Sequence, residues 1–316
     1  MADTDKRRQA ADALRHLALN EEAKKYILDR PRLYEAGLRA AQRFIGGETL
    51  DECIQEAKAI DRGGHLVSID FMGESTRARK MAQDATEEFV RIARAIDRHE
   101  IEASVSLDLS HVGMVIDEDL CLENANRIAE AACEANTEMM ISMEGADRTD
   151  TVLRLHQRLC ERFDNVGVTL QAYLRRTPDD LTTVMERPGK IRLVKGAFAT
   201  PEHLTVERRE CLLARYRELT GRLVSAGYPC SIATHDEHLL DSICQLVRDK
   251  FRSDGAVEFE MLKGVTTERL DALRTAGYQT RVYLPYGREW FLYICNRLAE
   301  HPPNLYQAIS DAVGDA

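Results

Sequence analysis

KIRLVKGAF (residues 190–198) and YPCSIATHD (residues 228–236) are short β-rich segments, and a longer amphipathic stretch follows each of them. The same rhythm recurs along the chain, in HLVSIDFM (65–72), IEASVSLDLS (101–110), EMMISME (138–144), NVGVTLQAYL (165–174), AVEFEMLKG (256–264) and QTRVYLPYG (279–287). Helical patterns lie between them, for example at residues 77–97, 119–135, 148–162 and 239–251. Strands that alternate with helices indicate a parallel sheet, and eight such units predict a closed (β/α)₈ barrel of the α/β class. No GxGxxG follows the first strand, so a Rossmann nucleotide site has no support.

The segments outside this repeat are helical. Residues 5–44 carry leucines and alanines at three- and four-residue spacing, and Pro31 interrupts them at the start of a new helix. We therefore predict an N-terminal helical segment at residues 1–46 and a barrel domain at residues 47–316. Residues 301–316 are predicted to form a short terminal helix with a frayed end.

Polar residues recur where the predicted strands end. They are Asp70, Glu74, Asp108, His111, Ser142, Glu144, Gln171, Lys195, His235, Asp236, Lys263 and Tyr283. In a barrel the carboxyl ends of the strands converge on one face, where catalysis takes place. The recurrence favours one shared polar site over ordinary loop polarity.

Composition narrows the class of protein. The chain has 316 residues, 44% of them hydrophobic and 30% charged, and a net charge of -10, which argues against a basic nucleic-acid-binding surface. None of its eight cysteines forms a CxxC pair, so no metal site is predicted and free thiols in a reducing cytosol are expected. The N-terminus lacks the apolar core of a signal peptide, and no run of about 18 apolar residues occurs. These features predict a cytoplasmic protein with at most peripheral contact with the inner membrane.

Several segments, taken in order, resemble the proline dehydrogenase family of monofunctional bacterial enzymes. They are IDFMGE (69–74), LQAY (170–173), IRLVKGAF (191–198), ATHD (233–236), EFEMLKG (258–264) and YLPYGREWFLYICNRLAE (283–300). The resemblance implies a distorted (β/α)₈ barrel that binds FAD without a covalent bond, with a C-terminal helix covering the active site. It also implies an oxidoreductase that removes hydride from the carbon beside a secondary amine and passes electrons to a quinone or to oxygen.

The resemblance further implies which residues contact the flavin: Gln171, Arg192, Val194, Lys195, Thr234, His235 and Glu258. Their chemistry is suitable, because Arg192 and Lys195 can stabilise negative charge on the reduced ring and the pyrophosphate. His235 alone could equally be a capping residue in a strand-to-helix turn.

The substrate side is expected on the C-terminal helix. Tyr293, Asn296, Arg297 and Glu300 follow i, i+3, i+4 and i+7 spacing and share one helical face. By the resemblance, Arg297 binds a substrate carboxylate and Glu300 orients the face. Tyr283 and Tyr293 form walls of the pocket, and Leu193 packs against the apolar side of the substrate. A solvated Arg–Glu helix pair is the alternative explanation for this pattern.

The substrate residues depart from the family pattern. Asn296 replaces the first of two adjacent arginines, Asp108 stands where a lysine is usual, and Ser142 replaces an aspartate. Phe198 replaces a tyrosine after LVKGA. The family's EFQ sequence is Glu258-Phe259-Glu260 in this chain, which is a change of lesser weight. The usual Lys, Arg, Arg and Asp sum to a charge of about +2, whereas the present set sums to about 0.

This difference in charge predicts a changed substrate. Aspartate in place of lysine turns attraction for a carboxylate into repulsion, and an ion pair at about 4 Å can contribute roughly 4 kcal/mol at an effective dielectric of 20. The expected substrate is a proline-like, N-substituted or hydrazino amino acid, to which Asp108 would attract an added positive group. An authentic L-proline dehydrogenase, a non-catalytic flavin-binding protein and a metal- or phosphate-dependent barrel lyase with His235 and Asp236 as ligands remain alternatives.

Overall fold

The structure is a computed structural model that describes residues 2–18, 20–207, 210–248, 256–300 and 312. The terminal helix predicted at residues 301–316 lies outside the described residues, apart from position 312. Among the described residues, no helix is both long enough and apolar enough to span a bilayer. By contact density the chain divides into two compact units, residues 1–56 with 284–316, and residues 57–283. The domain boundary at residues 46 and 47 stays a prediction.

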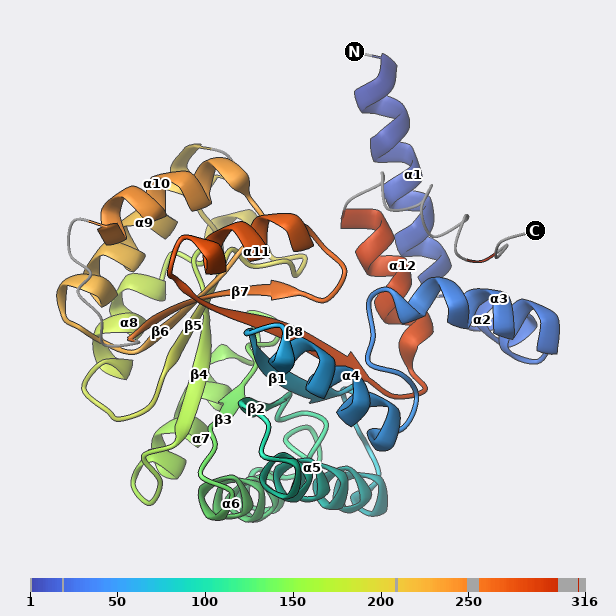
Figure 1. Cartoon of the computed structure of the whole chain (residues 1–316), viewed down its shortest axis with the longest axis horizontal. Coiled ribbons are helices and arrows are strands. Elements are labelled where there is room, and N and C mark those ends of the chain that lie inside the picture. The colour runs from blue at the N-terminus through green and yellow to red at the C-terminus, as the bar shows by residue number, and fades with distance from the viewer. Residues whose placement is uncertain (1, 19, 208–209, 249–255, 301–311, 313–316) are drawn as a thin grey trace. The chain divides into compact units, whose positions relative to one another are not determined.

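Eight parallel strands close into a barrel in chain order, which confirms the predicted fold (Figure 1). They are β1 (Leu66–Phe71), β2 (Ala103–Leu107), β3 (Met139–Ile141), β4 (Val166–Gln171), β5 (Ile191–Val194), β6 (Cys230–Ala233), β7 (Val257–Leu262) and β8 (Gln279–Tyr286). Each strand coincides with one of the predicted β-rich segments. Because side chains alternate along a strand, register decides which residues face inward, and Thr169, Arg192, Ser231 and Glu258 form one continuous row across β4 to β7.

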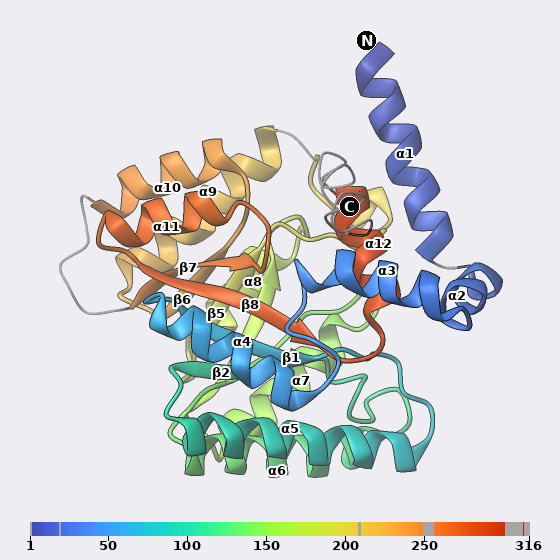
Figure 2. The same ribbon diagram turned by 45° about the vertical axis from the view of Figure 1, so that its right-hand side comes forward.

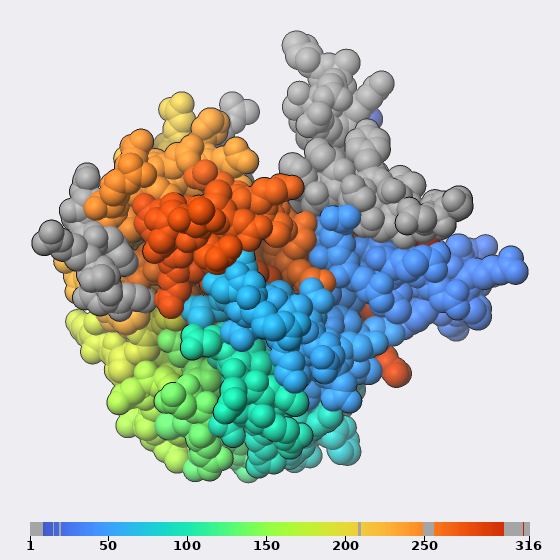
Figure 3. Space-filling view, viewed as in Figure 1, coloured from blue at the N-terminus to red at the C-terminus, as the bar shows by residue number. Residues whose placement is uncertain are grey.

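Helices α5 to α11 surround the strands of the second unit (Figures 1 and 2). Their bounds are α5 (Arg79–His99), α6 (Glu118–Glu134), α7 (Thr149–Cys160), α8 (Thr177–Val184), α9 (Glu210–Ser225), α10 (Glu237–Arg248) and α11 (Thr267–Thr275), with a 3₁₀ turn η1 (Glu202–Leu204). In the space-filling view these helices, together with the light-blue residues that precede β1, cover much of the face shown (Figure 3). The helices predicted at residues 77–97, 119–135 and 148–162 begin and end within two residues of the bounds of α5, α6 and α7, and the helix predicted at 239–251 overlaps α10 but ends outside the described residues. The contact of the strands with the helices supplies the apolar core.

The first unit contains α1 (Ala2–Ala18), α2 (Glu21–Leu28), α3 (Pro31–Gln42) and α12 (Trp290–Glu300), and α12 packs against α1 and α3. Pro31 starts α3 as predicted, since its missing N–H is not needed in a first turn. Trp290 is fully buried in this unit and donates from Nε1 to Glu48 Oε1 at 3.0 Å. A side chain at Gly37 would meet the Trp290 ring at 2.9 Å, so this glycine permits the close approach of α3 and α12.

The sequence interpretation missed α4 (Leu50–Arg62). Its start has a capping box, in which Glu52 Oε2 accepts from the Thr49 backbone N–H at 2.9 Å and Thr49 Oγ1 accepts from the Glu52 N–H at 3.4 Å. A threonine followed three residues later by glutamate is a recognised start signal, so this helix could have been found.

Candidate active site

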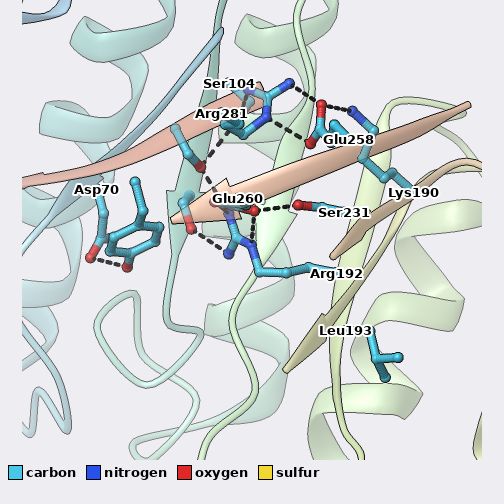
Figure 4. A network of polar contacts seen from close by, with 12 residues as sticks. Asp70, Ser104, Lys190, Arg192, Leu193, Ser231, Glu258, Glu260 and Arg281 are labelled. Carbon is cyan, nitrogen blue, oxygen red and sulfur yellow. Dashed lines mark hydrogen bonds and ion pairs between the residues drawn. The ribbon is translucent and has the colours of Figure 1, made fainter. Parts of the chain in front are cut away.

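The barrel interior contains ion pairs in place of the usual branched apolar layers. Arg281 on β8 donates to both oxygens of Glu258 on β7, at 2.7 and 3.0 Å, and Lys190 approaches the same carboxylate at 3.3 Å (Figure 4). Arg281 also donates to Ser104 Oγ and to the carbonyl oxygen of Val67. Burial raises the pKa of Glu258, but the charges of Arg281 and Lys190 outweigh it and lower that pKa to about 2.

A second ion pair lies two residues further along β7. Arg192 on β5 donates from Nε and Nη2 to the two oxygens of Glu260, both at 2.8 Å (Figure 4). Its remaining donors reach Ser106 Oγ at 3.1 Å and Ser68 Oγ at 2.8 Å. Ser231 donates to Glu260 Oε2 at 2.6 Å. Burial alone would lower the pKa of Arg192, but Glu260 raises it, so the guanidinium stays charged.

Above this pair, at the carboxyl ends of the strands, Tyr283 and Asp70 form the next polar contact. The Tyr283 hydroxyl donates to Asp70 Oδ2 at 2.7 Å, and the Arg192 guanidinium lies 5.3 Å from the centre of the Tyr283 ring. Burial raises the pKa of Asp70 to about 6, although the Tyr283 hydrogen bond and the charge of Arg192 oppose the shift. Burial also raises the pKa of Tyr283 well above its usual value, so its hydroxyl remains a donor.

Asp108 belongs to an acidic group at this end of the barrel. Burial raises the pKa of Asp108 well above its usual range, and the charges of Asp70, Glu144 and Glu74 raise it further. A hydrogen bond with Ser142 opposes the shift only in part. The surroundings therefore favour a neutral Asp108, which changes the charge count made from the sequence, where this carboxyl was taken as ionised.

The flavin-binding candidates fall into two groups. Most of them end or follow β4, β5 and β6 at the carboxyl end of the barrel: Gln171, Val194, Lys195, Thr234 and His235. Arg192 lies two residues before Val194 on β5, so it is deeper in the barrel than these residues. The structure does not bring Glu258 to this group, because it is the second residue of β7 and its carboxylate is held by Arg281 and Lys190.

Local contacts fix the residues that follow β5 and β6. Lys195 Nζ donates to Asp236 Oδ2 at 2.6 Å. Gly196 has φ of +103°, and a Cβ there would meet the Tyr173 ring at 2.1 Å, so only glycine fits the turn that follows Lys195. His235 contacts Thr266 Oγ1 through Nδ1 at 3.1 Å, and its Nε2 accepts from the Leu262 N–H at 3.4 Å. Since both ring nitrogens have partners in the protein, the metal-ligand alternative for His235 loses its support.

The predicted substrate residues are also divided. Asp108, Ser142 and Tyr283 lie at the carboxyl end of the barrel. Leu193 is fully buried, and its side chain points away from the polar network (Figure 4), so the structure does not bring it to the site. Tyr293, Asn296 and Arg297 lie on α12 in the other compact unit, where the Arg297 guanidinium is 5.1 Å from the Tyr293 ring centre. The side chain of Glu300 is outside the described part of the structure.

Sequence reasoning missed two residues at the centre of the network. Arg281 was not singled out, and Glu260 was noted only as a minor departure. A signal was present, because Glu258 and Glu260 alternate on β7 and Arg281 and Tyr283 alternate on β8, which places each pair on the same face of its strand. Charged residues on the inward face of barrel strands must find partners across the barrel.

Comparisons with known proteins agree with this architecture. The family model described as proline dehydrogenase matches residues 53–304. The chain is 30% identical over 291 residues to proline dehydrogenase 1 of Bacillus subtilis (strain 168), covering 92% of this chain and 96% of that protein. It is 32% identical over 287 residues to proline dehydrogenase of Deinococcus radiodurans, covering 88% and 93%.

A solved structure shows the same fold. Proline utilization A from Bdellovibrio bacteriovorus, in the form inactivated by N-propargylglycine, superposes with a TM-score of 0.78 at 21% identity. The match covers 94% of this chain and 37% of that longer chain.

The fold defines a (β/α)₈ barrel, a class of protein in which catalytic residues come from the carboxyl ends of the strands. The chain belongs to the proline dehydrogenase family, a flavin-dependent family of oxidoreductases acting on CH–NH donors.

Proposed function

We propose that this protein oxidises L-proline to 1-pyrroline-5-carboxylate with FAD as the two-electron acceptor. The substrate loses a hydride from carbon and a proton from nitrogen, and a C=N bond forms. The observation that carries the proposal is the family membership, with relatives named proline dehydrogenase at 30% identity or more over most of both chains. Those relatives favour proline over the changed substrate that the sequence alone predicted.

The donors at the carboxyl end of the barrel suit FAD. Lys195 and Thr234 follow β5 and β6, and they supply a cation and a hydroxyl group for phosphate or ribitol oxygens. His235, whose two ring nitrogens have partners in the protein, is proposed to shape this wall of the site. Gln171 is buried at the end of β4, where its Nε2 donates to the Glu144 carbonyl oxygen at 2.9 Å, and its amide is proposed to face the pyrimidine edge of the ring. When bound, FAD supplies hydride acceptance, and the protein supplies binding and orientation.

Protein supplied with FAD and then separated from unbound FAD by gel filtration is expected to be yellow, with absorption at about 375 and 450 nm. Under anaerobic conditions, L-proline is expected to bleach the band near about 450 nm, because the flavin accepts the electrons. Glycine, which is a primary amine, serves as the control. A protein that stays colourless with FAD contradicts the proposal, and a yellow protein that no amine bleaches favours the non-catalytic flavin-binding alternative.

The carboxylate of proline is proposed to bind Arg297, whose planar guanidinium can hold both carboxylate oxygens. Asp108 does not oppose this binding if it is neutral, as its buried surroundings favour, and a neutral carboxyl can even donate a hydrogen bond.

A second candidate is a secondary amine that carries an additional positive group, such as an N-substituted or hydrazino amino acid. The observation that favours it is the acidic group itself, in which Asp70, Glu74 and Glu144 all act on the charge of Asp108. A bound cation would ionise Asp108 and replace the lysine charge that the family normally places there.

Asp108→Asn separates the two candidates. If Asp108 is neutral and proline is the substrate, kcat/KM for proline should stay within about threefold of wild type at pH 7, a change below about 1 kcal/mol. The ratio of variant to wild type should then rise as pH rises through the raised pKa of Asp108, since only the wild type gains a repelling charge. Kinetics with proline over a range of pH measure this ratio. A gain of about 100-fold at pH 7 would instead favour the cationic substrate.

A further inference from the structure

Glu260 is the main charged partner of Arg192. Arg192 is 5% exposed and Glu260 is 3% exposed, and two hydrogen bonds of 2.8 Å join them. Ser231 on β6 donates a hydrogen bond to one oxygen of Glu260, while Ser68 and Ser106 accept hydrogen bonds from the guanidinium on the opposite side. The pair is therefore fixed from both sides within the barrel wall.

This ion pair coincides with a departure from the family pattern described in the sequence analysis. Where that pattern has an uncharged glutamine after EF, this chain has Glu260 on β7, and where it has aspartate this chain has Ser142, which follows β3. A neutral glutamine has only one acceptor oxygen, so it could not give Nε and Nη2 of Arg192 an oxygen each, and it would leave the positive charge unbalanced.

The charge of Arg192 would affect FAD bound by the residues at the carboxyl ends of β4 to β6, as proposed above. Hydride transfer brings two electrons and one proton, so it adds one negative charge to the isoalloxazine, and a nearby cation stabilises the reduced form. A carboxylate at 2.8 Å cancels most of that effect and also directs the guanidinium across the barrel toward β7.

We propose that Glu260 is a positioning residue that holds Arg192 within the barrel, offsets its charge, and thereby lowers the reduction potential of the bound flavin. The inference rests on the proposed binding of FAD. The two ideas fail separately, because FAD binding is read from the absorption of the wild-type protein, whereas Glu260 is tested by comparing variants that are already loaded with FAD.

Glu260→Gln keeps the shape and removes the charge. The flavin potential, measured by equilibration with a reference dye, is expected to rise by an amount that changes the ratio of reduced to oxidised flavin about tenfold, which is about 30 mV for a two-electron couple. Glu138→Gln is the matched control. Glu138 is 38% exposed and pairs with Lys190 at 2.8 Å, so the same charge is removed away from Arg192, and no shift is expected.

An unchanged potential in FAD-loaded Glu260→Gln, or a shift equal to that of Glu138→Gln, overturns the proposal. If Glu260→Gln does not fold, Glu260→Asp decides the question. Its carboxylate is one methylene shorter and cannot reach both nitrogens of Arg192, so the proposal requires a smaller rise in the same direction. A wild-type potential in that variant overturns it.

Discussion

Replacing Arg281 with methionine is expected to lower the free energy of unfolding by about 3–5 kcal/mol. The substitution leaves Glu258 buried with only Lys190 at 3.3 Å, and it removes the donors to Ser104 and to the Val67 carbonyl oxygen. A buried carboxylate without its main partner must either stay charged in a medium of low dielectric or take up a proton. Urea denaturation of the flavin-free protein measures the loss.

The double variant Arg281→Met with Glu258→Met is the control for this prediction. It replaces both charges with apolar side chains of similar size, so most of the lost stability should return. Lys190 keeps Glu138 as a partner at 2.8 Å in either variant. If the single and double variants are equally unstable, the loss comes from packing and the electrostatic explanation is wrong.

Arg297→Met is expected to lower kcat/KM for L-proline by about 100- to 1,000-fold, which corresponds to roughly 3–4 kcal/mol. The physical reason is that the carboxylate of the substrate would lose a charged, two-pronged partner, and Asn296 beside it offers only a neutral amide. Steady-state kinetics at several proline concentrations measure the effect, and the flavin absorption confirms that FAD is retained.

Arg288→Met is the matched variant, because Arg288 is an exposed arginine just before α12. It should leave kcat/KM within about twofold, as expected for a surface substitution. Equal effects of the two variants, or full activity of Arg297→Met, would exclude Arg297 as the carboxylate-binding residue.

The fold could be predicted from the sequence because each strand is a short apolar run with polar residues at its end. The ion pairs inside the barrel could not be predicted in this way. Arg192 and Glu260 are 68 positions apart, and only barrel closure and register bring them together. Glu260 therefore looked like a minor change, although it makes two of the hydrogen bonds that hold Arg192.

The charge of the site could not be predicted from the sequence either. Asp108 counted as a full negative charge when only residue types were known, but its pKa depends on burial and on three other carboxylates, two at or just after the end of β1 and one after β3. The positions of Gln171, Lys195 and His235 at strand ends followed from the motif order. The position of Leu193 could not be predicted from the motif order, because side chains alternate along β5 and Leu193 faces away from the side that Arg192 occupies.

The two halves of the barrel differ in what they place inside it. The half that contains β5 to β8, with Lys190 just before β5, carries five charged residues: Lys190, Arg192, Glu258, Glu260 and Arg281. They form three ion pairs with one another. Strands β1 and β2 contribute hydroxyl groups, Ser68, Ser104 and Ser106. Arg192 with Glu260 and Arg281 with Glu258 can therefore pair within the C-terminal half before the ring closes, whereas Lys190 gains its second partner from Glu138, the residue before β3. Closing the barrel then dehydrates two arginines that are already paired, which costs less than dehydrating lone ions.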